Sequence, residues 1–219
     1  MPGLKISAKL KLITKNEKTM IPKRERTLVF IKPDGVQRSL IGEIIQCYER
    51  TGLKLTALKF FTPPKELIEK HYLSFDGWLE SVGKKSMAAY ERKNLKPPYQ
   101  SPKECGQVVL GRLIRYLSSG PVVAMVWEGN EAVGVVKKIT GGTEPLTSDV
   151  GTIRGDLTID SYDLADTDDR AVRNLIHASG TPEEAEKEIT IWFKEEEILK
   201  YNIVQEKILY DVNLDGILE

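Results

Sequence analysis

Two histidines offer the side chains that best suit covalent or acid–base chemistry in this chain. His177 follows the apolar pair Leu175-Ile176 and lies shortly before a helix start at Thr181-Pro182. An imidazole has a pKa of about 6.5, so its neutral ring can attack an electrophile or move a proton near neutral pH. A histidine at a strand end is also often structural, and the local pattern leaves both roles open. His71, beside Tyr72 at the end of a short predicted helix, is interpreted as structural.

Three cations, Lys32, Lys137 and Arg154, lie at turns of the predicted structure. Each alone is typical of a solvated surface charge. Together with a histidine they favour phosphate chemistry, because negative charge on phosphoryl oxygens must be neutralised during transfer. The sequence has no Walker loop, no Gly-x-Gly-x-x-Gly after a strand and no Gly-x-Ser-x-Gly. These absences argue against P-loop, dinucleotide-binding and elbow-type serine hydrolase enzymes.

Alternating strands and helices must position these residues. Apolar runs predict strands, at 27–31, 53–61, 122–127 and 174–177. Apolar residues at helical spacing predict helices, at 41–48, 64–72, 113–117 and 132–139. Thr181-Pro182-Glu183-Glu184 predicts a further helix start, and Lys32-Pro33-Asp34-Gly35 predicts a turn. The order of elements indicates an α/β or α+β chain with a single sheet.

Two segments interrupt this order. The stretch 73–110 has no clear period, although some apolar residues within it have near-helical spacing, and Gly77, Gly83 and Pro97-Pro98 are expected to act as joints. Six aspartates lie between Asp156 and Asp169, which predicts an acidic loop.

Charge is balanced overall, with 32 basic and 32 acidic residues, so nucleic acid is not an expected partner. The balance is uneven, because residues 1–24 hold seven Lys or Arg against Glu17 alone. The alternating apolar residues of this basic leader suit a strand better than a helix. No apolar run is long enough for a membrane span, no signal peptide pattern opens the chain, and two cysteines, Cys47 and Cys105, form no disulfide framework. We therefore expect a cytoplasmic protein without a membrane contact.

Five segments, in this order, resemble the nucleoside diphosphate kinase family. They are Glu25-Arg26-Thr27 leading to Lys32-Pro33-Asp34-Gly35-Val36-Gln37-Arg38, the run 119–129, Gly151-Thr152-Ile153-Arg154-Gly155-Asp156, Asn174-Leu175-Ile176-His177-Ala178-Ser179, and the run 184–189. The resemblance implies an α+β fold, an α/β sandwich with a ferredoxin-like β-α-β-β-α-β core and an antiparallel sheet. Extra helices, two insertions and an N-terminal extension would complete it.

The resemblance also implies the reaction. The enzyme would transfer the γ-phosphate of a nucleoside triphosphate such as ATP to a nucleoside diphosphate, by a ping-pong mechanism through a phosphohistidine. Magnesium (Mg²⁺) would arrive with the nucleotide phosphates, without dedicated protein ligands. The family is a homo-oligomer, usually a hexamer and sometimes a tetramer, and the same is expected here.

Site residues follow from the resemblance position by position. His177 would be the nucleophile, with Glu188 and Ser179 orienting its ring. Lys32 would hold the transferring phosphoryl and the sugar hydroxyl region. The remaining substrate contacts would come from Arg154, Thr143 and Lys137 on the phosphates, Asn174 on the ribose, Tyr72 in the phosphate channel and Val109 at the base.

Departures from the family pattern fall at the nucleotide-binding end. Lys137 replaces an arginine and keeps its charge without the planar fork, and Val109 replaces a phenylalanine that stacks on the base. The predicted domain runs over 25–211, with insertions within 73–110 and 157–170 and a tail at 212–219. The first insertion is expected to form an enlarged lid over the nucleotide, or else to decorate the surface.

Two other functions stay open at this point. One is a catalytically weak, kinase-like module that binds nucleotide or nucleic acid, which the basic leader and Lys137 favour. The other is a phosphohistidine relay acting on proteins. Retention of every residue with a direct chemical role in the family favours the active kinase.

Overall fold

A computed structural model describes residues 24–92 and 94–210. The basic leader 1–24, apart from Arg24, lies outside the described residues, and so does the tail 212–219. The strand expected in the leader is therefore not addressed. None of the described helices is long and apolar enough to cross a membrane.

Four antiparallel strands form one sheet in the order β2-β3-β1-β4. The strands are β1 (Arg24–Ile31), β2 (Lys54–Phe61), β3 (Val122–Asn130) and β4 (Ile176–Ala178). The central pair is the longest, since β1 pairs with β3 from Arg24↔Asn130 to Ile31↔Val123. This strand order is that of the ferredoxin-like α+β core, so the expected fold class is confirmed.

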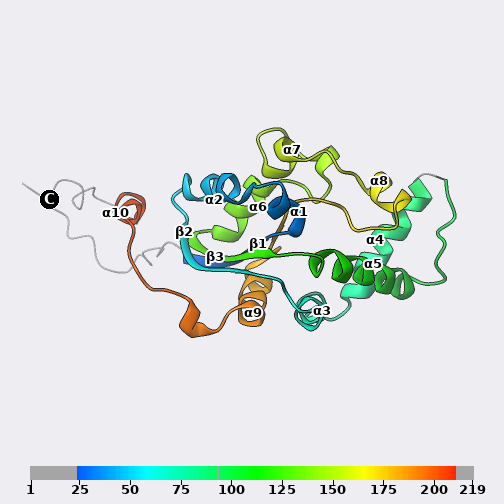
Figure 1. Cartoon of the computed structure of the whole chain (residues 1–219), viewed down its shortest axis with the longest axis horizontal. Coiled ribbons are helices and arrows are strands. Elements are labelled where there is room, and N and C mark those ends of the chain that lie inside the picture. Colours follow the sequence, from blue (N-terminus) through cyan, green and yellow to red (C-terminus); the bar gives the residue numbers. More distant parts are fainter. Residues whose placement is uncertain (1–23, 93, 211–219) are drawn as a thin grey trace, which may run out of the picture.

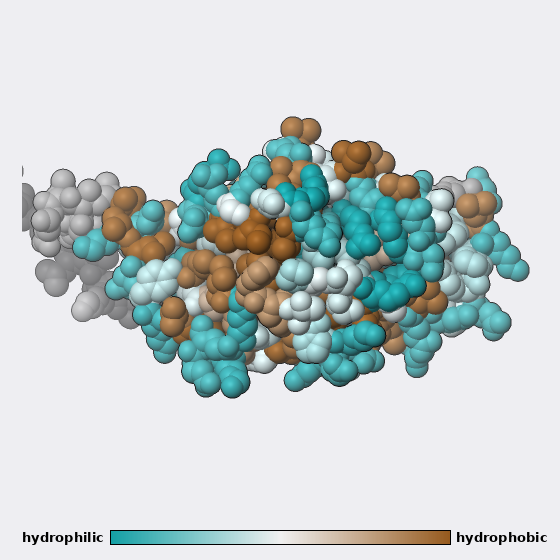
Figure 2. Space-filling model, in the orientation of Figure 1, coloured by the Kyte–Doolittle hydropathy of each residue, from teal (hydrophilic) through white to brown (hydrophobic). Residues whose placement is uncertain are grey.

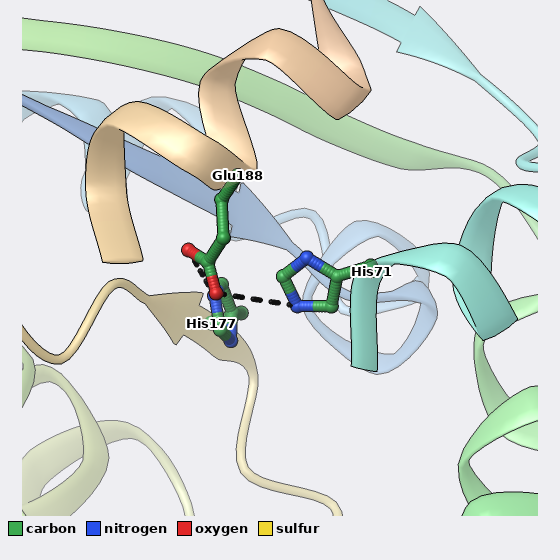
Figure 3. Close-up of side chains that lie close together, drawn as sticks. All are labelled: His71, His177 and Glu188. Carbon is green, nitrogen blue, oxygen red and sulfur yellow. Dashed lines mark hydrogen bonds and ion pairs between the residues drawn. The ribbon is translucent and has the colours of Figure 1, made fainter. Parts of the chain in front are cut away.

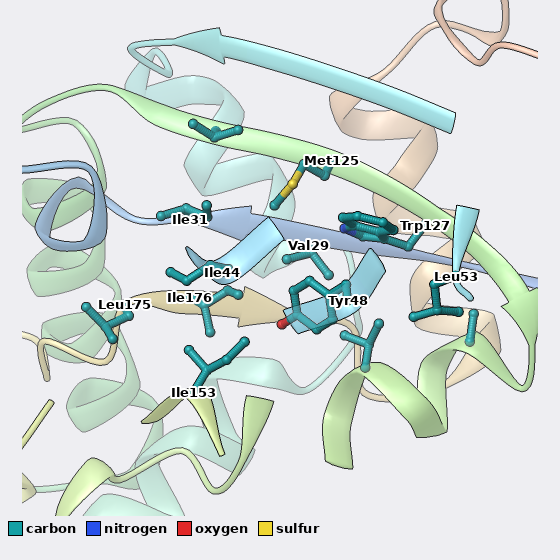
Figure 4. Packing of buried hydrophobic residues seen from close by; sticks show 13 residues of the cluster. Val29, Ile31, Ile44, Tyr48, Leu53, Met125, Trp127, Ile153, Leu175 and Ile176 are labelled. Carbon is teal, nitrogen blue, oxygen red and sulfur yellow. The ribbon is translucent and has the colours of Figure 1, made fainter. Parts of the chain in front are cut away.

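The two central strands are buried on both faces, and alternate residues divide between two cores. Val29 and Ile31 face one core, whereas Leu28 and Phe30 face the other. Successive side chains of a strand point to opposite faces, so a continuous apolar run indicates a sheet covered on both sides. Figure 4 shows the first core, in which Tyr48 and Trp127 pack beside Val29.

Helices cover both faces, with α2 and α6 on one side of the sheet and α3 and α9 on the other (Figure 1). Most of these helices were expected near their observed bounds. They are α2 (Ile41–Glu49), α3 (Lys65–Leu73), α6 (Ala132–Thr140) and α9 (Pro182–Trp192). Shorter elements are α1 (Pro33–Gln37), η1 (Pro145–Thr147), α7 (Ile153–Leu157), η2 (Glu195–Glu197) and α10 (Val204–Tyr210). The predicted turn at Lys32-Pro33-Asp34-Gly35 is in fact the first turn of α1, because proline suits the start of a helix.

The stretch 73–110 is far more regular than expected. It holds α4 (Trp78–Arg92) and most of α5 (Pro102–Leu117), which pack closely on each other. Gly83 is no joint, because it lies inside α4, where a Cβ would meet the Pro102 carbonyl oxygen at 1.7 Å. Gly106 makes the matching approach from α5, where a Cβ would meet the Leu79 carbonyl oxygen at 2.1 Å. Glycine here allows two helix backbones to touch.

The acidic segment also contains a helix, α8 (Tyr162–Thr167). Ser161 caps it by accepting a hydrogen bond from the Leu164 N–H at 3.2 Å. Arg112 on α5 donates to Asp166 at 3.0 Å and to Asp169 at 2.9 Å. Ion pairs therefore join α5, just after the first insertion, to the second insertion.

Candidate active site

His177 lies in the short edge strand β4, directly opposite Phe30 of β1. The Phe30 ring stacks on the His177 ring with centroids 4.6 Å apart and planes 17° apart. The His71 ring meets the His177 ring edge to face, with centroids 4.6 Å apart. Because two neighbouring rings restrict it, the His177 side chain is held in one orientation, with 18% of its surface exposed.

Glu188 and Ser179 lie behind His177, buried beneath the strand. The His177 Nε2 is 3.1 Å from Glu188 Oε2, and the Ser179 hydroxyl donates to the same oxygen at 2.6 Å. Burial alone would raise the pKa of the Glu188 carboxyl, but His177, His71 and Ser179 together lower it well below its usual range. An ionised carboxylate only accepts hydrogen bonds, so the proton of the neutral His177 ring is on Nε2. Its Nδ1 then carries the free lone pair.

A cleft of about 920 Å³ opens in front of His177. Eight of the ten residues expected at the site line it, namely Lys32, Tyr72, Val109, Lys137, Thr143, Arg154, Asn174 and His177. The other two, Ser179 and Glu188, are 0% and 4% exposed and reach the cleft only through His177. The structure thus brings the full predicted set to one place.

Lys32 directly follows strand β1, lines the cleft and is only 5% exposed. Its Nζ donates to Asn174 Oδ1 at 2.6 Å, and the Asn174 amide donates to the Thr143 carbonyl at 2.8 Å. Burial, with a further contribution from Arg154, lowers the pKa of the Lys32 amine from 10.5 to about 7. Among the described residues Lys32 forms no ion pair, and a bound anion would stabilise its charged form.

Arg154 is directed at main-chain carbonyls. Its Nε donates to the Asn174 carbonyl at 3.1 Å and its Nη2 to the Ile176 carbonyl at 2.6 Å. Its Nη1 donates to the Gly141 and Gly142 carbonyls, each at 3.1 Å. Since a guanidinium has five N–H donors, these contacts leave one for a ligand. Arg154 thus ties the 141–142 loop to the strand that carries His177.

Leu175, between the Asn174 and Ile176 carbonyls that Arg154 binds, has an unusual backbone conformation. Leu175 is fully buried with a φ of 65°, in the left-handed region. Its N–H donates to Asp34 Oδ2 at 3.1 Å, and its carbonyl accepts from the Lys32 N–H at 2.8 Å. Such a conformation persists only where neighbouring groups hold it. Here the Lys32-Pro33-Asp34-Gly35 segment fixes the turn that leads to His177.

The other expected residues differ in exposure. Lys137 is exposed, and its Nζ donates to the Gly180 carbonyl at 3.1 Å. Thr143 is exposed on the loop after α6, where its main-chain carbonyl accepts from the Asn174 amide. Burial raises the pKa of the Tyr72 hydroxyl above its ordinary value. Val109 lies on α5, one turn from Arg112.

Several cleft residues were not expected from the sequence. Lys84 and Lys85 of α4 line the cleft, as do Arg112 of α5 and Tyr162 of α8. Among the described residues, Lys84 and Lys85 have no ion pair. The sequence indicated a role for Lys84 and Lys85 only weakly, since two adjacent lysines on a polar helix are usually solvated. Only the folding of α4 over the cleft distinguishes them.

A carboxylate-held histidine at the base of a cation-lined cleft, on an antiparallel α+β sandwich, suits an enzyme that handles phosphate groups. Comparison with known proteins narrows this class. A family model of nucleoside diphosphate kinase matches residues 25–78 and 79–198. The chain belongs to the nucleoside diphosphate kinase family.

The chain is also similar to individual members of this family. The nucleoside diphosphate kinase of Pyrobaculum aerophilum is 47% identical over 180 residues, covering 80% of this chain and 98% of the relative. That of Ginglymostoma cirratum is 40% identical over 188 residues, covering 86% and 99%. The crystal structure of an NDP kinase from Pyrobaculum aerophilum matches with a TM-score of 0.78 and 45% identity, over 81% of this chain and 100% of that one. A Borrelia burgdorferi nucleoside diphosphate kinase with bound vanadate and ADP matches with a TM-score of 0.69 and 36% identity, over 84% and 96%.

Proposed function

We propose that this chain transfers the γ-phosphoryl group of a nucleoside triphosphate to a nucleoside diphosphate, with His177 as the covalent carrier. One observation carries the assignment of the nucleophile. Glu188 accepts from His177 Nε2, so the lone pair is on Nδ1 of the one histidine that lines the cleft. A carboxylate that fixes the tautomer of a histidine and stabilises positive charge on its ring is the arrangement used in catalytic triads.

The reaction runs as two matched half-reactions. In the first, a bond forms between Nδ1 and the γ-phosphorus while the bond to the β,γ-bridging oxygen breaks, and the electron pair leaves with the diphosphate. In the second, a terminal oxygen of another nucleoside diphosphate attacks the phosphohistidine and Nδ1 leaves. One site serves donor and acceptor in turn, because covalent catalysis splits the transfer into two similar steps.

We assign phosphate contacts to the cations around the carrier. Lys32 faces the transferring phosphoryl, and its short-range partner is the neutral amide of Asn174. Lys137 and Thr143 lie on exposed parts of the cleft wall and suit the outer phosphates. Arg154 contributes one remaining N–H and holds the loop on which Thr143 lies. Asn174 faces the sugar with the part of its amide that Lys32 and Thr143 leave free, and Tyr72 lines the phosphate path.

Magnesium enters as part of the nucleotide substrate. The carboxylate that lines the cleft among the described residues is Asp166, which Arg112 already binds. Magnesium prefers oxygen ligands and keeps several waters, so substrate phosphates suit it better than this wall does. The ion would offset phosphate charge, while the protein cations orient the oxygens.

The insertions form the wall of the cleft at its nucleoside end. Val109 and Leu113 of α5 offer apolar contact to a base, and Lys84 and Lys85 of α4 add positive charge. A wall of this kind excludes water from the phosphohistidine, which otherwise hydrolyses without transfer. We therefore keep the lid interpretation for the 73–110 insertion, as a rigid helical wall.

The assembly and location are proposals of the same kind. Leu58 and Phe60 on the edge strand β2 are 48% and 61% exposed, which supports a homo-oligomer. Figure 2 shows apolar side chains gathered near the middle of one face, at the level of the sheet. A hexamer or tetramer is expected. A cytoplasmic location remains a prediction, since one relative from Pisum sativum is chloroplastic.

Labelling with ATP tests the function directly. Incubation with γ-labelled ATP and magnesium should give an acid-labile, alkali-stable label on His177, and a GDP chase should release it as labelled GTP. His177→Ala should bind nucleotide without becoming labelled. Labelling that persists in His177→Ala would show that another residue carries the phosphoryl. Binding without any labelling of the native protein would favour the weak, kinase-like module instead.

A further inference from the structure

His71 occupies an unusual position for a residue without a role in the reaction. It is on α3, only 2% exposed, and lies between Trp192 and the Glu188–His177 pair. The side chains of His71, His177 and Glu188 come from α3, β4 and α9 and point toward one another (Figure 3). Their ligand-type atoms all lie within 4.8 Å of one another.

Trp192 determines which nitrogen of His71 carries the proton. The Trp192 indole N–H donates to His71 Nδ1 at 3.1 Å. An indole nitrogen can only donate, so Nδ1 must accept and the proton of the neutral ring is on Nε2. Burial, together with the nearby His177, lowers the pKa of His71 from 6.5 to about 3, so the ring is neutral near pH 7.

This tautomer excludes metal binding at the cluster and favours an electrostatic role. A metal would need a free lone pair on His71 Nε2, which is the protonated nitrogen. That N–H instead faces Glu188 Oε1 at 3.7 Å. The distance is too long for a hydrogen bond in the nucleotide-free state, but contacts of this kind shorten in the reacting complex.

Glu188 needs such a neighbour. Its Oε2 accepts from both Ser179 and His177, whereas Oε1 faces His71. The terminal torsion of a glutamate is broad, so a carboxylate held by one oxygen can rotate away. A donor on the second oxygen restrains that rotation.

We infer that His71 is a positioning residue, whose Nε2–H holds the Glu188 carboxylate toward His177 and so keeps the His177 lone pair on Nδ1. The inference rests on the assignment of His177 as the carrier. The chain of contacts runs from Trp192 through His71 and Glu188 to His177. His71 is buried and is not among the residues that line the cleft, so it should act on the rate of transfer and not on substrate affinity.

Two substitutions separate positioning from packing. His71→Phe keeps a buried ring against His177 but removes the donor to Glu188 and the acceptor for Trp192. His71→Gln offers an amide N–H toward Glu188 and an amide oxygen toward Trp192. We expect kcat to fall roughly tenfold or more in His71→Phe, with the KM for nucleotides unchanged within about twofold, and to recover in large part in His71→Gln.

The tautomer of His177 gives a readout that does not depend on turnover. Nitrogen-15 NMR of the nucleotide-free protein should show His177 protonated on Nε2 in the native chain, with a larger Nδ1–H fraction in His71→Phe. A second variant, Trp192→Phe, leaves His71 in place but removes the donor that fixes its tautomer, and it should shift the His177 signal part of the way. This variant keeps the test available if His71→Phe folds poorly. Native kcat and a native tautomer in folded His71→Phe would overturn the inference. An equal loss in both His71 variants with an unchanged tautomer would also overturn it, as would an unchanged tautomer in Trp192→Phe. Failure of His177 to become labelled by ATP would overturn only the proposed function.

Discussion

At the scale of single residues, burial of the Lys32 charge lowers the stability of the nucleotide-free protein, and a bound phosphate would offset this effect. Its amine is buried beside Arg154, and its pKa is lowered from 10.5 to about 7. Between these values the unfolded chain binds a proton that the folded chain lacks, so this group makes stability rise with pH in that window. Below about pH 7 the cost of burying the charge is fully present.

Replacing Lys32 with methionine should therefore separate stability from activity. We expect Lys32→Met to raise the melting temperature of the nucleotide-free protein at pH 6. Each kcal/mol added to the free energy of unfolding should raise the melting temperature by about 2–4 °C. The difference between variant and native protein should disappear as the pH approaches 10.5. Activity should fall at least about a hundredfold, because a cation facing the transferring phosphoryl is lost. Melting curves at several pH values and kcat/KM measure the two effects.

Lys137 provides the matched control for this prediction. It is exposed, so Lys137→Ala should damage kcat/KM less than Lys32→Met does. Lys137→Arg should be neutral or mildly improving, since the guanidinium restores bidentate contact. Equal damage from Lys137→Ala and Lys32→Met would contradict the ranking.

At the scale of elements, the α4–α5 hairpin is fixed by close contact of two backbones. A Cβ on Gly83 would lie 1.7 Å from the Pro102 carbonyl oxygen, whereas a Cβ on Gly111 of α5 would meet nothing within 4 Å. Backbone cannot move aside as a flexible side chain can. The two glycines thus have opposite tolerance to the same substitution.

Gly83→Ala should destabilise the protein by about 1–3 kcal/mol, the usual cost of overpacking, and should loosen the wall of the cleft. Gly111→Ala should be neutral or stabilising by up to about 1 kcal/mol, because alanine favours a helix over glycine. Urea denaturation measures both, and hydrogen exchange of α4 locates the effect. A stable Gly83→Ala protein with normal exchange would show that the helices do not touch in solution.

The lysines on the same hairpin allow a test of the lid interpretation. A nucleotide that reaches this wall should lose electrostatic attraction in a Lys84→Ala, Lys85→Ala double variant. We expect KM for nucleoside diphosphates to rise about three- to tenfold at low salt, with kcat little changed, and the difference to shrink as salt screens the charges. Lys103→Ala on α5 is the control, since Lys103 is exposed and is not among the residues that line the cleft. Equal KM values in the double variant and the control would indicate that the insertion only decorates the surface.

At the scale of the whole molecule, the edge strand β2 is the exposed side of the sheet. Its residues Leu58 and Phe60 are exposed, and unpaired backbone groups of an edge strand readily associate. Phe60→Glu should lower the oligomeric state, because burying a carboxylate at an interface is costly. Light scattering coupled to gel filtration measures the mass. An unchanged mass in Phe60→Glu would place the interface elsewhere.

A truncated chain beginning at Lys23 keeps all of β1, so we expect it to retain the native oligomeric state and turnover.

Much of the fold follows from local pattern. The runs 27–31 and 122–127 are apolar at successive positions, so they predict strands, and the structure confirms them as parts of β1 and β3. The helices α2 and α6 were expected because their apolar residues recur at helical spacing, and α9 was expected from the helix start at Thr181-Pro182-Glu183-Glu184. The stretch 73–110 was not resolved into two helices, because Pro97-Pro98 and mixed charge obscure the period and because Gly83 is a packing residue there.

The sequence by itself determined the fold class, the family and eight of the residues that line the cleft, since each depends on local patterns or on ordered motifs. The tertiary structure alone decided how these residues act on one another. His71 and Glu188 are 117 residues apart, and their facing side chains depend on how α3 packs against α9 beside the sheet. The stacking of Phe30 on His177 likewise depends on the register between β1 and β4. Such contacts join distant segments, and their geometry is set by the packing of the whole core, which no local pattern encodes.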